Sequence, residues 1–344
     1  MIISKTPFRV SFFGGGTDYP SWYLKEDGAV LSTTIDKYCY ISCRVLPPFF
    51  ETKYRIVWSH IETVSTISEI LHPAVREGLK YIGINGNNGG LEFHHQGDLP
   101  ARAGMGSSSS FVVGLFKAII ALTGKIIGKH ELAAKAIDFE QSVLKENVGS
   151  QDQVAASYGG FNVIRFYQNG DIRVEPITIP TARISELESH LMMLYTGTSR
   201  LSSEVAGDII ANLPKKKNVL NKMHAMVDQA LNILNGNDDL EKFGRLLNHT
   251  WELKSSLSNR ISNSNIDRIY ATARANGAVG GKLLGAGASG FMLFFAPPEK
   301  QQQIKDALPG YLHVPFKFES EGSTIIYYSA RDQTEYKSPI QESS

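Results

Sequence analysis

A small-residue loop that leads directly into an apolar helix constrains this chain more than any other segment. The loop, Pro100–Ser110, contains Gly104, Gly106 and four consecutive serines, and the residues from Phe111 to Leu122 are mostly apolar. A helix start offers unpaired backbone N–H groups and the positive end of the helix dipole, and glycines let the backbone approach an anion closely. The junction predicts a phosphate-binding site, with a serine N-cap that holds no ligand as the alternative.

Neither of the two best-known nucleotide-binding motifs fits the sequence. A P-loop requires glycine, four residues and then Gly-Lys-Ser/Thr. At Gly281-Lys282, Asn276 stands where the first glycine is needed and Leu283 where the hydroxyl is needed. The segment Gly285–Gly290 has the glycine spacing of a dinucleotide-binding loop, but the apolar residues after it predict a strand instead of the helix that would hold a pyrophosphate. We therefore interpret it as a glycine-rich loop of another kind.

The composition is that of a globular protein with two domains. The chain has 344 residues, 42% of them hydrophobic, and a formal charge of +1. This charge gives no electrostatic reason to expect nucleic acid or an acidic membrane as a partner. The N-terminus lacks the apolar region of a signal peptide and Lys117 interrupts the longest apolar run, so we predict no membrane span and a cytoplasmic location. Cys39 and Cys43 would stand about 13 Å apart on one face of a strand, too far for a disulfide.

Predicted strands precede predicted helices in the first part of the chain. Strands are predicted at Phe8–Phe13, Ala29–Thr34, Tyr38–Val45, Arg55–Trp58 and Leu91–His95, and helices at Ser108–Leu122 and Glu131–Glu146. This order favours an α+β domain over regular β-α-β alternation. After a connector at Pro176–Glu188, a second domain is predicted with helices at Ser202–Ala211, Val219–Asn235, Asp239–Leu257 and Asn265–Asn276, and strands at Phe291–Phe295 and Thr324–Tyr328.

Two acidic residues lie at positions where a carboxylate is unusual. Glu140 falls within the apolar stripe of the helix predicted at Glu131–Glu146. A buried carboxylate is costly unless it is paired or bound to a metal, so Glu140 is either a metal ligand, a member of a core ion pair or a boundary residue. Asp152 falls in the first turn of a short helix that Ser150 is expected to cap, where the helix dipole favours an acid with or without a catalytic task.

The segment Pro7–Pro20 is a predicted strand that ends in three glycines followed by Thr17 and Asp18. Arg9 lies on this largely apolar strand, so its guanidinium either faces water at an edge or points into a site.

The order and form of three segments, Pro7–Pro20, Pro100–Ser108 and Gly281–Gly290, resemble the superfamily that contains galactokinase, homoserine kinase, mevalonate kinase and phosphomevalonate kinase, the GHMP kinases. The resemblance extends from about residue 2 to residue 330. It implies an α+β fold with a ribosomal protein S5 domain 2-like N-terminal domain at residues 1–180. A ferredoxin-like C-terminal domain would follow at 181–332, and a polar tail at 333–344.

The resemblance also implies the roles of individual residues in an ATP-dependent kinase that uses Mg²⁺. Asp152 would take the proton of the acceptor hydroxyl and Arg9 would steady that carboxylate. Mg²⁺ would be held by Ser108 and Glu140. The phosphates would contact Gly104, Met105, Gly106, Ser107, Ser108 and Ser109, with Gly285 and Gly287 closing from the other domain, and the sugar would contact Asp18 and Thr17.

Within the superfamily, an arginine at position 9 followed by Thr17-Asp18 resembles sugar kinases, because the isoprenoid-pathway members have lysine there. Gly14-Gly15-Gly16, Tyr195–Ser203 and Trp251–Lys254 resemble the branch that acts on heptose 7-phosphate. The chain departs from that branch at Ser150, where lysine is expected, and at Ala288-Ser289, which replace a pair richer in glycine.

This branch implies phosphorylation of the C1 hydroxyl of D-glycero-D-manno-heptose 7-phosphate, which would supply nucleotide-activated heptose for cell-surface polysaccharide. The partners would be a sugar phosphate and ATP, and a homodimer stays open. Arg200 is the first candidate for the 7-phosphate contact and Lys254 the second. The alternatives are a kinase of a fucose-like or galactose-like sugar, and a sensor that binds sugar and ATP without turnover.

Overall fold

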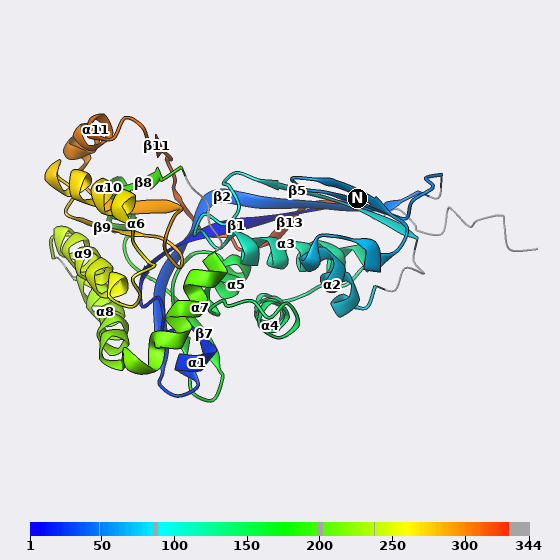
Figure 1. Cartoon of the computed structure of the whole chain (residues 1–344), viewed down its shortest axis with the longest axis horizontal. Coiled ribbons are helices and arrows are strands. Elements are labelled where there is room, and N and C mark those ends of the chain that lie inside the picture. Colours follow the sequence, from blue (N-terminus) through cyan, green and yellow to red (C-terminus); the bar gives the residue numbers. More distant parts are fainter. Residues whose placement is uncertain (48, 85–88, 198–201, 237, 330–344) are drawn as a thin grey trace, which may run out of the picture.

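The structure is a computed structural model that describes residues 1–47, 49–84, 89–197, 202–236 and 238–329. The molecule is elongated, with a long sheet and its helices at one end and the helices α8 to α11 at the other (Figure 1). No helix within these residues is long and apolar enough to cross a membrane.

The larger sheet has nine strands and contains both ends of the described chain. Its main path is β13-β1-β2-β5-β3-β4, while β12 and β6 also pair with β2, and β7 pairs with β6. The strands are β1 (Ile2–Phe13), β2 (Gly28–Leu46), β3 (Tyr54–Val57), β4 (Ile61–Val64), β5 (Gly90–Gly97), β6 (Phe161–Phe166), β7 (Ile172–Pro176), β12 (Phe318–Glu319) and β13 (Thr324–Tyr328).

The strand β2 joins two segments that the sequence predicts as separate strands. Its pairing with β1 shifts register between Pro7 and Phe8, whose partners are Tyr38 and Ile35. The polar pair Asp36-Lys37, which separates the two predicted strands, is therefore accommodated as an irregularity within one continuous strand.

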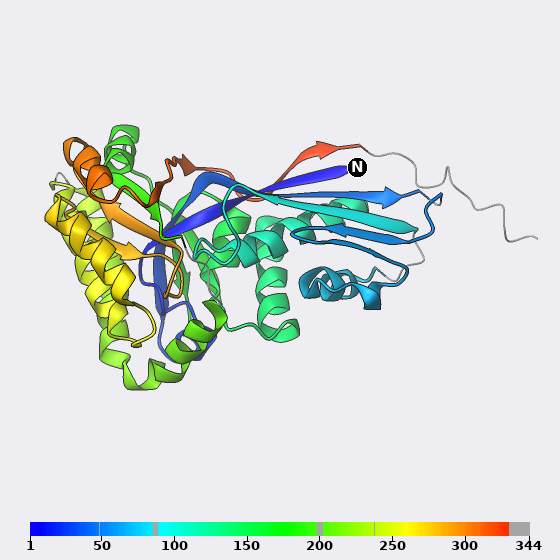
Figure 2. The same ribbon diagram turned by 45° about the horizontal axis from the view of Figure 1, so that its top comes forward.

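Helices cover one face of this sheet, as the two views of Figures 1 and 2 show. They are α2 (Pro73–Ile82), α3 (Ser107–Leu122), α4 (Lys129–Asp138) and α5 (Gln151–Tyr158), and the remaining short helices of this part are α1 (Pro20–Tyr23) and a 3₁₀ turn at Ile67–Glu69. The prediction of a helix from Ser108 to Leu122 is confirmed to within one residue. The helix predicted at Glu131–Glu146 is shorter, because it changes to a π-helical turn at Phe139–Val143 and ends before Lys145, whose φ is 55°.

The second part of the molecule is an antiparallel sheet with the order β11-β8-β10-β9, packed with helices. Its strands are β8 (Leu191–Tyr195), β9 (Gly280–Leu283), β10 (Phe291–Phe295) and β11 (Leu312–His313); its helices are α6 (Thr181–Ser189), α7 (Ser202–Asn212), α8 (Lys217–Asn235), α9 (Glu241–Ser255), α10 (Ser264–Ala275) and α11 (Pro298–Ala307), with a 3₁₀ turn at Leu213–Lys215. The strand predicted after the glycine-rich loop, Phe291–Phe295, is confirmed.

The last two strands return to the first sheet, and this corrects the predicted domain boundary. The sequence places Thr324–Tyr328 in the second domain, within residues 181–332, but this segment forms β13 and pairs with β1. Similarly, β12 pairs with β2. The local sequence pattern identifies Thr324–Tyr328 as a strand, but its partner is selected by tertiary contacts with the opposite end of the chain.

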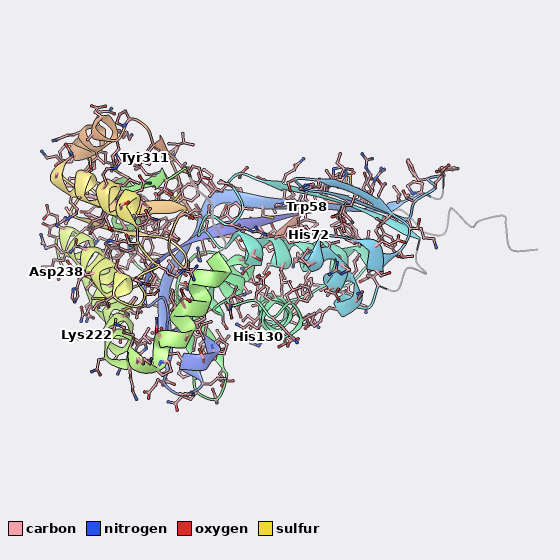
Figure 3. The ribbon with its side chains drawn as sticks, viewed as in Figure 1. Trp58, His72, His130, Lys222, Asp238 and Tyr311 are labelled. Carbon is pink, nitrogen blue, oxygen red and sulfur yellow. The ribbon has the colours of Figure 1, made fainter. Side chains whose placement is uncertain are left out.

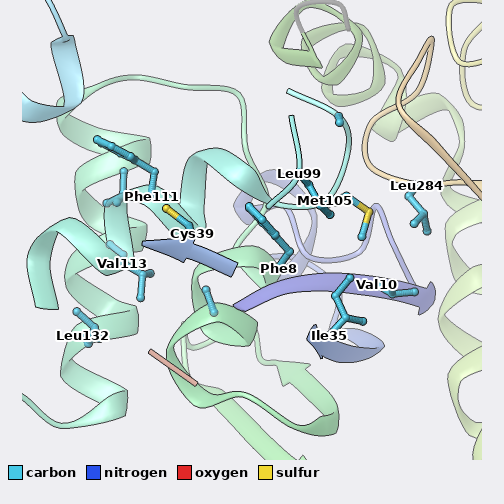
Figure 4. Packing of buried hydrophobic residues seen from close by; sticks show 14 of the residues in the cluster. Phe8, Val10, Ile35, Cys39, Leu99, Met105, Phe111, Val113, Leu132 and Leu284 are labelled. Carbon is cyan, nitrogen blue, oxygen red and sulfur yellow. The ribbon is translucent and has the colours of Figure 1, made fainter. Parts of the chain in front are cut away.

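The hydrophobic core is continuous between the two parts. On β1, Phe12 and Phe13 make edge-to-face contacts with Phe243 of α9, with ring centroids 5.5 and 4.9 Å apart. Farther along the sheet, the core under α3 contains Cys39 (Figure 4). As predicted, Cys39 and Cys43 are both free, and both are buried.

Candidate functional site

The start of α3 has the geometry of an open anion-binding loop. Gly106 is the N-cap residue with φ 72° and ψ 25°, and no side chain caps the helix. The first intrahelical hydrogen bond runs from Ser110 N to Gly106 O, 2.9 Å, so the amides of Ser107, Ser108 and Ser109 point out of the helix end. This geometry agrees with the predicted phosphate site, since three N–H groups and the helix dipole face the same space.

Two side chains of this loop point away from any ligand. Met105 is fully buried beside Leu99 and Phe8 (Figure 4), and its carbonyl accepts a hydrogen bond from Arg9 N at 3.2 Å. Ser109 is buried and its hydroxyl donates to Glu140. The predicted nucleotide contacts of Met105 and Ser109 are thus restricted to their main chain, because packing against the core fixes both side chains.

Arg9 and Asp152 form a two-pronged ion pair beside the loop. Arg9 Nε donates to Asp152 Oδ1 and Nη2 donates to Oδ2, both at 2.8 Å, while Nη1 donates to Gly104 O at 2.7 Å. The Arg9 side chain is 6% exposed and the Asp152 side chain 21%. Of the two predicted orientations of Arg9, the edge position facing water is therefore wrong. The guanidinium fixes the plane of a carboxylate that keeps an open side.

Asp18 lies next to this pair on a segment that is hydrogen-bonded to the start of α5. Its Oδ1 accepts from Gly16 N at 3.0 Å and its Oδ2 from Gln151 Nε2 at 2.9 Å. Burial, and then the charge of Asp152, raise the pKa of the Asp18 carboxyl above its usual value. Gly149 passes so close to Asp18 that a Cβ there would come within 1.9 Å of the carboxylate.

Thr17 has a structural role in this segment. Its hydroxyl is fully buried, lies 2.7 Å from Gly14 O and 3.0 Å from Ala29 O, and accepts a hydrogen bond from Ala29 N. The single proton of the hydroxyl and one of its two lone pairs are thus used within the protein. The side chain closes the turn that positions Asp18, and the predicted sugar contact of Thr17 stays a prediction.

Glu140 is fully buried behind the start of α3. Its Oε1 accepts from Ser108 Oγ at 3.0 Å, and its Oε2 accepts from Ser109 Oγ at 2.7 Å and Gln153 Nε2 at 2.5 Å. Burial raises the pKa of Glu140 to about 7. In the part of the chain that the structure describes, Glu140 forms no ion pair, so the predicted core ion pair is wrong and the metal ligand stays a prediction.

The glycine-rich loop at 285–290 meets the phosphate-binding loop from the other side. A Cβ at Gly285 would lie 2.4 Å from Gly104 Cα, and one at Gly290 would lie 2.3 Å from Ala103 O. Main chain therefore touches main chain between the two parts of the molecule, which only glycine permits. Gly287 is also a glycine by necessity, with φ 134°.

Lys254 supports this loop. It is buried, and its Nζ donates to Leu283 O at 2.7 Å and to Gly285 O at 2.5 Å. Two carbonyls thus engage two of the three N–H donors of the ammonium group, and the predicted phosphate contact of Lys254 stays a prediction. The first candidate for that contact, Arg200, lies outside the described residues.

Sequence reasoning missed Lys282, Gln151 and Gln153. Lys282 is 3% exposed, and its Nζ donates to Phe12 O across the two parts of the molecule at 2.8 Å. Burial and the charge of Arg9 lower its pKa to about 7. The two glutamines flank Asp152 and hold Asp18 and Glu140. In the sequence, the only indication that Gln151 and Gln153 have a role in the site is that they flank an acid at the start of a helix.

Ser150 occupies the predicted N-cap position of α5 but does not cap the helix with its side chain. Its buried hydroxyl lies 3.2 Å from Tyr23 Oη and accepts a hydrogen bond from Gln141 Nε2 at 3.1 Å. At the position where the resemblance implies lysine, serine thus has a buried structural role.

An aromatic cluster lies beside α3, one turn after its start. Trp58 and His72 are neighbours (Figure 3) with ring centroids 4.8 Å apart, and His72 stacks on Phe111 at 4.8 Å. Burial lowers the pKa of His72 to about 4, so the imidazole is neutral at pH 7. The cluster lines a cavity of about 10 Å³, which holds about one water molecule.

Comparison with known protein families gives two matches. Residues 68–160 match the family described as GHMP kinases N terminal domain, and residues 219–313 match GHMP kinases C terminal. The two matched segments contain the start of α3 and most of the second part of the molecule, respectively.

Individual relatives are similar over most of the chain. D-glycero-alpha-D-manno-heptose 7-phosphate kinase of Campylobacter jejuni is 31% identical over 347 residues, which cover 93% of this chain and 97% of that protein. The bifunctional fucokinase/GDP-fucose pyrophosphorylase of Arabidopsis thaliana is 25% identical over 88% of this chain and 30% of its own length. The crystal structure of a D-glycero-D-manno-heptose 1-phosphate kinase from Bacteroides thetaiotaomicron superposes with a TM-score of 0.77 at 23% identity, over 96% of this chain and 100% of that one, which shows a shared fold.

Proposed function

The chain belongs to the GHMP kinase family, and we propose that it is the member that phosphorylates the C1 hydroxyl of D-glycero-D-manno-heptose 7-phosphate. That it is a sugar kinase with ATP as phosphoryl donor follows from the family and from its sugar kinase relatives. The heptose substrate is supported by the relative from Campylobacter jejuni, which is similar along nearly its whole length.

The observation that carries the proposal is the position of Asp152 between a phosphate-binding helix start and a second acid. Asp152 Oδ2 lies so close to Gly106 that a Cβ there would be 3.3 Å away, and the carboxylate is held by Arg9. We infer that the sugar hydroxyl donates its proton to Asp152 as it attacks the γ-phosphorus of ATP, while the bond to the β,γ-bridging oxygen breaks and ADP leaves. Arg9 keeps the carboxylate oriented and offsets the charge on the attacking oxygen.

The amides at the start of α3 would bind the transferred and neighbouring phosphates, and Asp18 would accept hydrogen bonds from sugar hydroxyls. Asp18 is suited to this task because its two oxygens are held by Gly16 N and Gln151 while retaining free lone pairs. The base of ATP would contact the neutral aromatic surface of Trp58, His72 and Phe111, after side chains there move to enlarge the cavity.

Ser108 and Glu140 fit the Mg²⁺ that kinases of this kind use. A hydroxyl and a carboxylate are the oxygen ligands that this ion prefers, and the amide oxygen of the fully buried Gln153 beside Glu140 has no hydrogen-bond partner. The described residues contain no cluster of three or more His, Cys, Asp or Glu side chains, so water and phosphate oxygens would complete the set. Mg²⁺ would neutralise the negative charge of the phosphates.

A substrate panel tests the proposal. ADP release should be fastest, by kcat/KM, with heptose 7-phosphate, and phosphorus NMR should locate the new phosphate on C1. Preference for fucose or galactose would establish the alternative sugar kinase, and binding of every sugar without turnover would establish a sensor. The cytoplasmic location, the homodimer and the supply of nucleotide-activated heptose stay predictions.

The 7-phosphate contact is tested separately with Arg200→Ala. If Arg200 binds that phosphate, the KM for heptose 7-phosphate should rise roughly tenfold to a hundredfold, as expected for the loss of one charge-assisted contact. The KM for ATP and the slow turnover of unphosphorylated heptose should stay the same. An equal loss with both sugars would show that Arg200 supports the fold or the nucleotide site instead.

A further inference from the structure

Glu146 is a partly buried acid to which the roles above assign no task. Its Oε2 lies 3.4 Å from Ser108 Oγ, and the same hydroxyl lies 3.0 Å from Glu140 Oε1. A serine hydroxyl has one proton and donates to one carboxylate at a time. Ser108 therefore lies between two acids, one of which always lacks this hydrogen bond.

The backbone brings Glu146 to this position through an unfavourable conformation. Lys145 has φ 55°, in the left-handed region that residues with a Cβ rarely adopt, and Glu146 N donates to Glu140 O at 2.9 Å. The turn folds the second carboxylate back toward a hydroxyl that Glu140 already contacts. Such local strain is a reason to look for a functional task at the residue it positions.

The two acids lie close enough to repel each other. Neither Glu140 nor Glu146 forms an ion pair within the described ranges; Arg102 favours the charged form of Glu146 from nearby, but it is exposed and so offsets the repulsion only in part. Two neighbouring carboxylates repel each other. A divalent cation that accepts oxygen ligands would remove this repulsion.

We propose that Glu146 is a further ligand of the Mg²⁺ that Ser108 and Glu140 would hold, either directly or through one of the waters of the ion. The inference rests on the proposed function for the presence of the ion. Glu140 is fully buried, whereas Ser108 is exposed and Glu146 is partly exposed. Glu146 is thus the more accessible of the two acids, and its removal should weaken retention of the ion without opening the interior site.

The test measures binding of Mg²⁺ together with a non-hydrolysable ATP analogue, by calorimetry and by thermal shift, in the full chain. Glu146→Gln should require about tenfold more Mg²⁺ for half-saturation, the lower end of what outer ligands of metal sites contribute. Without metal, the same variant should melt at the same temperature as the wild type or higher, because a repulsion has been removed. Glu131→Gln, which removes an exposed acid of α4, is the control for net charge and should leave the Mg²⁺ dependence unchanged.

A second variant, Glu146→Asp, keeps the charge and should restore part of the Mg²⁺ affinity. The proposal is overturned if Glu146→Gln has the Mg²⁺ dependence of Glu131→Gln, or if it lowers the melting temperature without metal, since the acid would then pair with Arg102. These readouts do not depend on the sugar. Normal Mg²⁺ binding without ADP release from any sugar would contradict the proposed function and leave the role of Glu146 intact.

Discussion

Both carboxylate oxygens of Asp152 accept hydrogen bonds from Arg9. This geometry determines how much catalytic activity the loss of the carboxylate should cost. Asp152→Asn keeps the size of the side chain but cannot accept a proton, so kcat should fall about a hundredfold or more. The dissociation constants for ATP and sugar should change little, because both ligands also contact other groups. Steady-state kinetics measures kcat, and calorimetry measures the dissociation constants. An unchanged kcat would show that positioning and electrostatics alone account for the rate.

Lys282 gives a pH dependence of stability whose sign follows from its lowered pKa. In the folded state the pKa is about 7, against about 10.5 in the unfolded chain. Between these values the unfolded state binds the additional proton, so stability rises with pH; below pH 7 both states are protonated and the cost of burial is fully present. Relative to Lys282→Met, the wild type should gain about 2 kcal/mol between pH 7 and pH 9. Urea unfolding at both values checks this, and a constant difference would show that Lys282 is buried without a change in protonation.

At the scale of the secondary-structure elements, two glycine-containing loops contact each other. Substitution of one glycine inside this contact and of one outside it tests its importance. Gly285 and Gly124 both have positive φ, but a Cβ at Gly285 would lie 2.4 Å from Gly104 Cα, whereas a Cβ at Gly124 meets nothing within 4 Å. Gly124→Ala should cost only the backbone strain, about 1 kcal/mol. Gly285→Ala should cost more and also raise the KM for ATP, because it separates the loops. Equal melting temperatures and equal KM values would show that the loops are free to separate.

Secondary structure that depends on neighbouring residues could be predicted from the sequence. Structure that depends on contacts with distant residues could not. The loop at Gly104–Gly106 and the helix after it follow from glycine spacing and apolar composition alone, and α3 begins within one residue of its predicted start. The π-helical turn at Phe139–Val143 has no such local pattern, so the end of α4 was misplaced, although the stripe that contains Glu140 correctly indicated a buried acid. The internal hydrogen bonds of Thr17 and Lys254 could not be predicted, because sequence does not reveal which carbonyl groups lie within reach of a side chain.

At the scale of the whole molecule, the continuous core predicts one cooperative unfolding transition. Phe243 is fully buried and contacts Phe12 and Phe13, so each part of the molecule stabilises the other through one aromatic cluster. Phe243→Ala should lower the free energy of unfolding by about 3 to 5 kcal/mol. Calorimetry should still show a single transition, shifted to lower temperature. Two separate transitions in the wild type would mean that the parts unfold independently.

The return of β13 to the side of β1 has a consequence for the order in which the chain can fold during synthesis. The first strand leaves the ribosome long before its partner on one side, Thr324–Tyr328, has been made. Until that segment emerges, β1 has β2 on one edge and an open edge on the other. The nascent N-terminal sheet therefore has an unpaired strand edge during this time. Such edges can pair with other chains and are protected by chaperones.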